Sequence, residues 1–243
     1  MSPAAPKERE ATEAVLAGTA LTVSVRGHEL LRDVDVAVRP GAVVGVLGPS
    51  GAGKTTLFRT LVGEWVPSAG KVTLRGVDVT RLPLFRRARL GIGYVPQAPS
   101  VLMDLTVADN VRTFERAAGV RPTNPRDRAA TVELEGRLDV RARDLSGGER
   151  RRLELLRGLL GDPVVLVCDE PFAASDPIHL ALLSRLIRGH ADRGNAVLLA
   201  DHRLSEALSI CDEALLLVDG RVAHVGPASA FAEHPAVKAR YLG

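Results

Sequence analysis

Gly48-Pro49-Ser50-Gly51-Ala52-Gly53-Lys54-Thr55 is the stretch that decides the fold of this 243-residue chain. It matches the pattern G-x-x-x-x-G-K-[ST], in which glycines let backbone amides curl around phosphate oxygens. An uncharged apolar run, residues 42–47, precedes it, and apolar residues at i,i+4 spacing follow it as far as Gly63. A buried strand, a glycine loop and a helix in this order predict a nucleoside triphosphate site, since the helix N-terminus adds a positive dipole.

The residues of this loop have different expected roles. The Lys54 ammonium should reach the β- and γ-phosphates, and the Thr55 hydroxyl should bind Mg²⁺. The predicted phosphate-binding residues are Gly48, Pro49, Ser50, Gly51, Ala52, Gly53, Lys54, Thr55 and Thr56.

The rest of the chain repeats the pattern of an α/β fold. Residues 164–168 and 196–200 are further buried-strand runs. Between them lies a helix that Asp176 can cap, with Ile178 expected on its apolar face. Residues 20–38 alternate as paired strands do. We therefore expect a parallel sheet with an antiparallel part before it.

Two segments differ from this pattern. Residues 105–144 are rich in Arg and acids and lack a strand signal, so they predict a helical insertion of about residues 98–160. Residues 1–14 are expected to be a disordered tail, and the acids at 8, 10 and 13 exclude a signal peptide.

Composition excludes several classes of protein. The chain has 32 Lys+Arg against 29 Asp+Glu, without the basic cluster of a nucleic-acid binder, so no nucleic-acid partner is expected. No apolar run is long enough to span a bilayer, which takes about 18–20 residues. Its two cysteines, Cys168 and Cys211, predict small core residues rather than a disulfide framework.

Residues 145–149, Leu-Ser-Gly-Gly-Glu, open another helix. Ser146 and Glu149 form a capping-box pattern, which explains both residues without any ligand. It does not explain Gly147 and Gly148, whose exposed amides at a helix start suit an anion. From the residues alone both interpretations stand.

Asp169 and Glu170 follow the strand at 164–168. Ligands of open α/β sheets collect at the carboxyl ends of strands, so Asp169 can hold Mg²⁺ and Glu170 can polarise a water. The alternative is that both acids cap the next helix.

Over residues 15–243 the chain resembles the ATP-binding cassette (ABC) ATPases. The motifs that carry this resemblance, in the order of the family, are the loop 48–56, Gln97 in Tyr-Val-Pro-Gln, LSGGE at 145–149, Cys-Asp-Glu-Pro at 168–171, Asp176 and His202. The resemblance implies a P-loop NTPase fold, with a RecA-like core, an antiparallel β subdomain and an inserted helical subdomain.

The resemblance also implies a mechanism with ATP and Mg²⁺. Two chains would form a head-to-tail homodimer, with Ser146, Gly147 and Gly148 binding the partner's ATP. Glu170, His202 and Gln97 would be catalytic. Thr55, Gln97 and Asp169 would hold the metal, and Asp176 would lie at the dimer contact.

Residues 85–97, 145–152, 169–178 and 200–202 are most similar to the lipopolysaccharide-export ATPases. This implies an ATPase peripheral to the cytoplasmic face of the inner membrane, driving lipopolysaccharide or lipid export through separate transmembrane permease subunits. The alternatives are a branched-chain amino-acid importer ATPase, a soluble non-transport ABC ATPase and a degenerate ATP-binding half of a heterodimer. Transported substrate and direction stay open.

The chain departs from the family pattern at three places, and one of them is that the helical insertion looks short. Val25 stands where the family stacks an aromatic ring on adenine. Leu102 and Met103 replace an aromatic–basic pair and are predicted to line the groove for the membrane partner, with core packing as the alternative. Arg86, Arg87 and Arg89 have no acid nearby in sequence, which favours the solvated face of a short helix.

Overall fold

The computed structural model describes residues 14–173 and 176–242, which fold around a six-stranded sheet. Five of its strands are parallel, and β10 pairs antiparallel at one edge. In sheet order the strands are β10 Arg221–Pro227, β9 Glu213–Val218, β3 Val43–Leu47, β8 Ala196–Ala200, β7 Val165–Asp169 and β6 Ile92–Val95. The predicted α/β fold is confirmed.

A second, antiparallel sheet packs beside the first. Its order is β2-β1-β4-β5, with β1 Leu16–Val25, β2 His28–Val38, β4 Ala69–Leu74 and β5 Val77–Asp78. β1 and β2 join through Arg26 and Gly27, both with positive φ, as a two-residue hairpin turn of the mirror type requires. Asp219 and Gly220 make the same kind of turn between β9 and β10.

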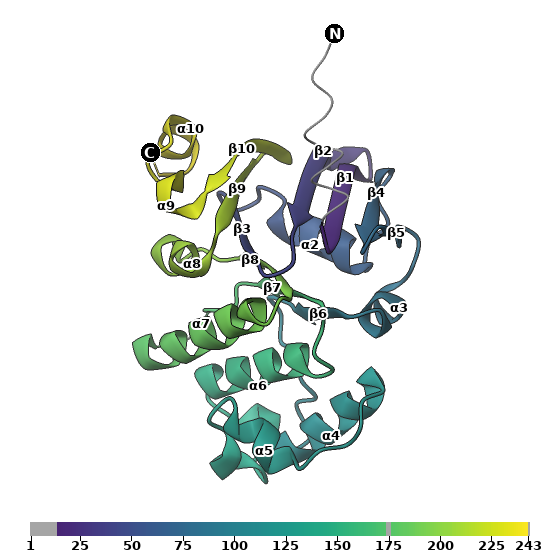
Figure 1. Cartoon of the computed structure of the whole chain (residues 1–243), viewed down its shortest axis with the longest axis vertical. Helices are drawn as coiled ribbons and strands as arrows, with labels where there is room; N and C mark the ends of the chain where they lie inside the picture. Colours follow the sequence, from purple (N-terminus) through teal and green to yellow (C-terminus); the bar gives the residue numbers. More distant parts are fainter. Residues whose placement is uncertain (1–13, 174–175, 243) are drawn as a thin grey trace.

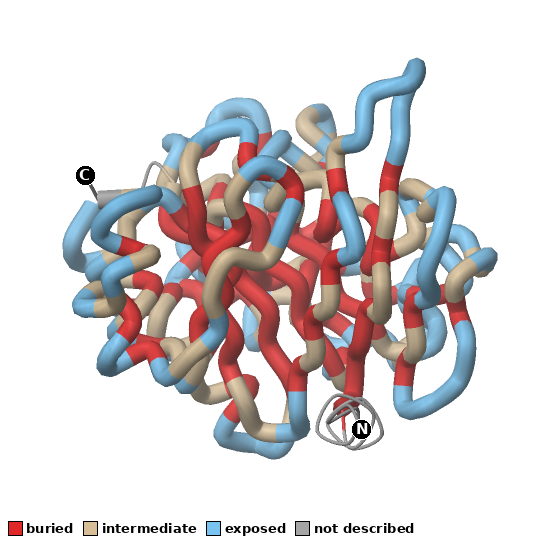
Figure 2. The backbone as a smooth tube through the Cα atoms, turned by 90° about the horizontal axis from the view of Figure 1, so that it is seen from above, coloured by how far each residue is buried: buried red, intermediate tan, exposed pale blue. Residues whose placement is uncertain are grey.

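Helix α2, Lys54–Val62, lies between the two sheets and ends at Gly63, as predicted. Its buried residues share one core with β1, β2, β4 and one face of the parallel sheet. The other face packs on α7 Pro177–Asp192, α8 Leu204–Ile210, α9 Ala228–Phe231 and α10 Pro235–Val237. Figure 2 shows the parallel strands buried along their length in the middle of the molecule.

The segment between β6 and β7 is helical and forms the lower part of Figure 1. It contains α4 Val107–Ala118, α5 Pro125–Ala130, the 3-10 turns η1 Glu135–Arg137 and η2 Ala142–Asp144, and α6 Gly147–Leu159. Most of it has a core of its own. Helix α6 belongs to both cores, since Leu153 and Leu156 face the helical core while Leu155 packs on the sheet.

The structure differs from the sequence expectations at Ala14 and at Ile178. Residues 1–13 of the predicted tail lie outside the described residues, and Ala14, the last residue of that tail, is buried. Ile178 is 78% exposed, so its expected place on the apolar face of α7 is wrong; Leu182 and Leu183 supply that face. None of the helices in the described ranges combines the length and apolar character that a membrane span needs.

Candidate functional site

The predicted chemistry collects at one edge of the parallel sheet. The loops that leave the carboxyl ends of β3, β6, β7 and β8 meet there, as expected for an open α/β sheet. They enclose a pocket of about 680 Å³. Its lining includes the loop 48–56, Gln97, Asp169, Glu170 and His202.

The phosphate loop depends on glycine at two close approaches. Gly48 has φ 150°, and a Cβ there would lie 2.0 Å from the carbonyl oxygen of Leu217. Gly53 has φ 105° and directly precedes α2; a Cβ would lie 2.9 Å from Leu31 Cδ2. Larger residues would therefore displace the loop that presents its amides to a phosphate.

Lys54 is held inside this loop. Its Nζ donates to the carbonyl oxygens of Gly48 and Pro49, at 2.6 and 2.8 Å. Burial lowers the pKa of Lys54, while the carboxylates of Asp169 and Glu170 act in the opposite direction. The ammonium is therefore held by the loop itself, close enough to both carboxylates to interact with their charges.

Asp169 ends β7 and is 1% exposed. Burial raises the pKa of Asp169, and a hydrogen bond from Thr55 opposes this shift. Its Oδ2 has no hydrogen-bond partner among the described residues. A buried carboxylate oxygen beside a hydroxyl is the donor set that Mg²⁺ prefers, so the residues fit the predicted metal site.

Glu170 directly follows Asp169 and has an unusual backbone. Its φ is 54°, uncommon for a residue with a side chain, and its N–H donates to the Ala200 carbonyl at 2.7 Å. The turn therefore presents the Glu170 carboxylate to the pocket rather than continuing the strand. Such strain is found where a functional side chain has to be aimed.

His202 lies beside this carboxylate. Its Nδ1 is 3.7 Å from Glu170 Oε2 and 3.6 Å from Asp201 Oδ1. Asp201 is fully buried and accepts from the backbone N–H groups of Phe172 and Arg203. Asp201 thus fixes the loop that carries His202, which lines the pocket.

Ser146, Gly147 and Gly148 do not line this pocket. Ser146 caps α6: its Oγ accepts from the Glu149 N–H, and Glu149 Oε2 accepts from the Ser146 N–H. A hydrogen bond from Arg137 is the main cause that lowers the pKa of Glu149 to about 2. The capping interpretation is therefore confirmed, yet Gly147 stays exposed at the helix start. Its amide is open to an anion from another molecule.

Three further predicted residues also lie outside the pocket. Asp176 caps α7, with Oδ1 accepting from two backbone N–H groups, at Ile178 and His179. Leu102 is 39% exposed, whereas Met103 packs partly against the helical core. The core-packing alternative therefore applies to Met103 more than to Leu102.

Arg87 contradicts the solvated-face expectation. It is fully buried, and its guanidinium donates to the carbonyls of Thr60 and Leu61 at the end of α2 and to those of Leu82 and Thr80. Burial lowers the pKa of Arg87 to about 10. The side chain ties α3, Leu84–Arg89, to the last turn of α2, which sequence spacing could not indicate.

Sequence reasoning missed some of the pocket lining. Glu29, Leu30, Arg32 and Tyr241 all face the pocket, from β2 and from η3, Lys238–Leu242. Tyr241 comes from the end of the chain, so only the tertiary fold brings it there.

Val25 is 40% exposed at the end of β1 and is not among the described residues that line the pocket. We expect Val25→Tyr to tighten ATP binding several-fold or more, because base stacking on an aromatic ring is worth about 1–3 kcal/mol. We also expect the wild-type chain to discriminate weakly between ATP and GTP. Nucleotide titration of both proteins checks this, and unchanged affinity with a lower melting midpoint would contradict it.

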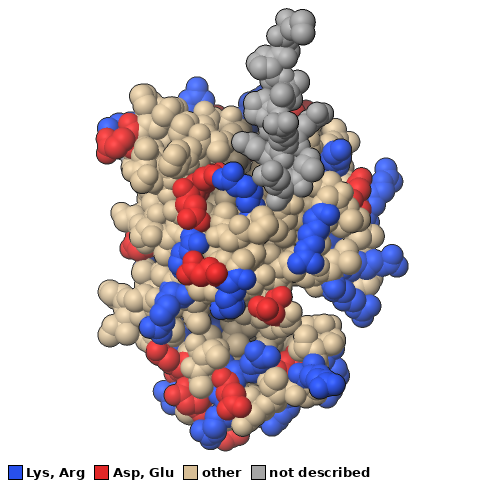
Figure 3. Space-filling view, in the orientation of Figure 1, with Lys and Arg blue, Asp and Glu red and all other residues tan. Residues whose placement is uncertain are grey.

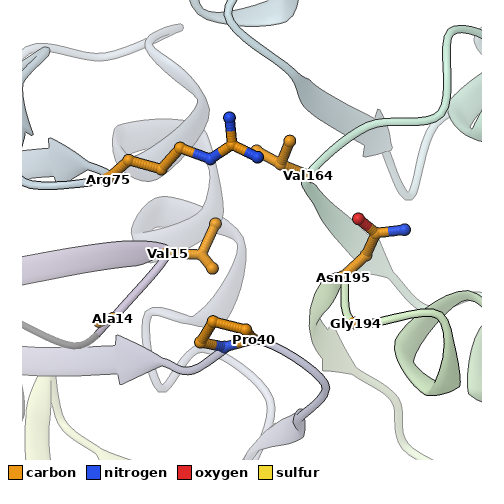
Figure 4. A pocket seen from close by; sticks show the side chains of 7 residues that line it. All are labelled: Ala14, Val15, Pro40, Arg75, Val164, Gly194 and Asn195. Carbon is orange, nitrogen blue, oxygen red and sulfur yellow. The ribbon is translucent and has the colours of Figure 1, made fainter.

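A second cavity, of about 380 Å³, lies at the opposite, amino ends of the strands (Figure 4). Arg75 and Asn195 reach towards it over an apolar floor of Val15, Pro40 and Val164. The described residues that line it are Ala14, Val15, Pro40, Arg75, Val164, Gly194 and Asn195, and none of these is a carboxylate or a nucleophile.

The chain is similar to a known family and to several known proteins over most of its length. The family model described as "ABC transporter" matches residues 31–173. The lipopolysaccharide export system ATP-binding protein LptB of Acidithiobacillus ferridurans is 41% identical, covering 94% of this chain and 97% of that protein. LptB of Escherichia coli K12 is 36% identical, covering 95% and 98%. A nucleotide-free ATP-binding cassette from an ABC transporter superposes with a TM-score of 0.85 at 24% identity, covering 95% of this chain and 99% of that one.

Proposed function

Because this chain belongs to the ABC transporter family as its ATP-binding, ATP-hydrolysing subunit, we propose that it drives export of lipopolysaccharide or a related lipid. The support for this substrate is the similarity to the LptB proteins over nearly the whole chain. The support for the chemistry is one observation: a single pocket gathers the phosphate loop, Gln97, Asp169, Glu170 and His202, while Ser146–Gly148 lie outside it.

That separation favours a composite site. The α6 N-terminus offers exposed amides that no phosphate in the chain's own pocket would use. A head-to-tail homodimer would place Ser146, Gly147 and Gly148 of each chain against the ATP held by the other. Asp176, at the start of α7, would lie at the contact between the chains.

The residues of the pocket then have different roles in ATP hydrolysis. The loop amides and Lys54 bind the phosphates and hold the terminal one in place. Glu170 orients a water and accepts its proton as the water attacks the γ-phosphorus and the bond to the leaving ADP oxygen breaks. His202 donates a hydrogen bond to the γ-phosphate and keeps the Glu170 carboxylate close by.

Thr55, Asp169 and Gln97 would hold Mg²⁺, which when bound neutralises charge on the β- and γ-phosphates. The orphaned Oδ2 of Asp169 supports this assignment. Gln97 is exposed at the pocket rim, so its amide can also contact the attacking water.

A membrane partner would dock near the segment between β6 and α4. Leu102 is exposed there, and Phe85 and Leu90 are exposed on and after α3. Figure 1 places α3 and α4 along the same edge of the molecule. Exposed apolar anchors of this kind suit a helix from transmembrane permease subunits, which would keep the chain peripheral on the cytoplasmic face of the inner membrane.

Leu102→Glu is expected to release the membrane partner while basal ATP hydrolysis stays within about twofold of wild type, because a charge cannot be buried in an apolar contact without a large desolvation cost. Co-purification of the tagged chain with its membrane subunits measures this. Val66→Glu, at another exposed apolar residue, is the control. Retention of the partner by Leu102→Glu would contradict the docking site.

The substrate is tested by reconstitution. The permease subunits that co-purify are placed in liposomes with this chain, and ATP hydrolysis is measured with lipopolysaccharide or with branched-chain amino acids. Stimulation by lipopolysaccharide alone supports export, and stimulation by the amino acids alone would favour the importer alternative.

A further inference from the structure

Arg151 occupies a position that the proposed chemistry does not use. It lies on α6 one helical turn after Gly147 and is 5% exposed. A guanidinium has five N–H donors in a fixed plane. All five of them are used here.

Four of the acceptors are backbone carbonyls of the catalytic loops. Nη2 donates to the carbonyls of Asp169 and Glu170, at 2.6 and 2.8 Å. Nη1 donates to Pro96 at 2.9 Å, one residue before Gln97, and Nε donates to Pro171 at 3.3 Å. One side chain therefore contacts the loop after β6 and the loop after β7.

The fifth acceptor is the carboxylate of Glu154, 2.6 Å from Nη1, which balances the buried charge. Glu154 Oε1 in turn accepts from the Ser100 N–H. Arg157, one turn further on, donates to the Tyr94 carbonyl at the end of β6. These residues at i, i+3 and i+6 form a polar stripe on α6 that faces the strand ends.

We propose that Arg151 is a positioning residue for ATP hydrolysis, which holds the backbone of residues 169–171 so that Glu170 keeps its strained, left-handed conformation. This inference rests on the proposed ATPase. Because the same helix starts with the residues offered to the partner's ATP, a shift of α6 on closure acts directly on the chain's own Glu170. Arg151 thus connects the two composite sites.

Arg151→Gln should lower kcat by about 10²-fold, since small misplacements of catalytic groups have effects of this size. ATP affinity should stay within about twofold, because the phosphate loop is untouched. Arg151→Lys keeps the charge but has only three donors, so its kcat should lie between the kcat of wild type and that of Arg151→Gln. Arg150→Lys is the matched control, since Arg150 donates only to carbonyls of Ala142, Arg143 and Leu145 in the helical insertion.

The measurements are steady-state ATP hydrolysis, nucleotide titration and a melting curve on each purified variant. Loss of kcat with retained binding, absent in Arg150→Lys, supports the proposal. If Arg151→Gln does not fold, the Arg151→Lys variant is tested instead: a lower kcat with retained ATP binding supports the proposal, and an unchanged kcat overturns it. Equal loss in Arg150→Lys would assign the effect to general stability of α6 and overturn it.

A mixed dimer tests whether Arg151 acts within its own subunit. Wild type paired with Glu170→Gln leaves one competent site, whose single-turnover hydrolysis is measured. Arg151→Gln should lower that turnover by about 10²-fold when placed in the chain that supplies Glu170, and leave it unchanged in the other chain. The reverse result would overturn the positioning role. A wild-type chain without ATPase activity would contradict the proposed function, whereas full activity of Arg151→Gln beside an active wild type would contradict only this inference.

Discussion

Glu170→Gln is expected to reduce ATP turnover by about 10²–10⁴-fold, the range typical of a lost general base. The amide has nearly the shape of the carboxylate but cannot accept the proton of the attacking water. Its side chain leaves the phosphate loop unchanged, so ATP should bind as in wild type. With ATP bound and not hydrolysed, the dimer should remain closed and run as a dimer in gel filtration only when ATP is present.

Three measurements check this expectation: ATPase rate, ATP titration and gel filtration with and without nucleotide. Glu29→Gln is a useful control because Glu29 lines the same pocket but comes from the start of β2 in the antiparallel sheet, not from the carboxyl end of a parallel strand. Wild-type turnover in Glu170→Gln would show that another group activates the water.

Ser146→Arg is expected to remove nearly all ATPase activity, although Ser146 lies outside the pocket that holds the chain's own nucleotide. A bulky cation at this helix start would block the approach of the partner's phosphate. It would also remove the cap of α6, which stabilises a helix by about 1 kcal/mol. Ser146→Ala serves as the control, because it loses the cap without adding bulk.

Mixing separates a composite site from simple misfolding. Lys54→Ala alone should be inactive because its phosphate loop fails. A mixed dimer of Lys54→Ala with Ser146→Arg has one interface in which an intact loop meets an intact α6 start, so part of the activity should return. No recovery after subunit exchange would count against a head-to-tail dimer.

The half of the site within one chain was predictable because its residues follow strands in sequence. Asp169, Glu170 and His202 each come directly at or after a buried parallel strand, and parallel strands deliver their carboxyl ends to one edge. The glycine loop was predictable for the same reason. For these residues, the position directly after a strand in the sequence is enough to predict their place at the edge of the sheet.

Arg87 and Arg151 were beyond this kind of inference. Both are buried arginines whose acceptors are mainly backbone carbonyls. Every residue has a carbonyl, so no sequence pattern marks the ones that converge on a guanidinium. Charge suggested solvent exposure for Arg87, and only packing reverses that expectation. Tyr241 was missed for a related reason, since its contact spans most of the chain.

The capping box of α6 has a thermodynamic consequence for assembly. A serine hydroxyl has one hydrogen to donate and two lone pairs that accept. In the cap, Ser146 Oγ accepts from the Glu149 N–H and its hydroxyl also hydrogen-bonds the Glu149 carboxylate, so the side chain is held from both directions. The rotamer and the first helical turn are already ordered before a second chain arrives. Association therefore loses little conformational entropy at this contact, and preorganisation of this kind raises affinity without adding any new atom to the interface.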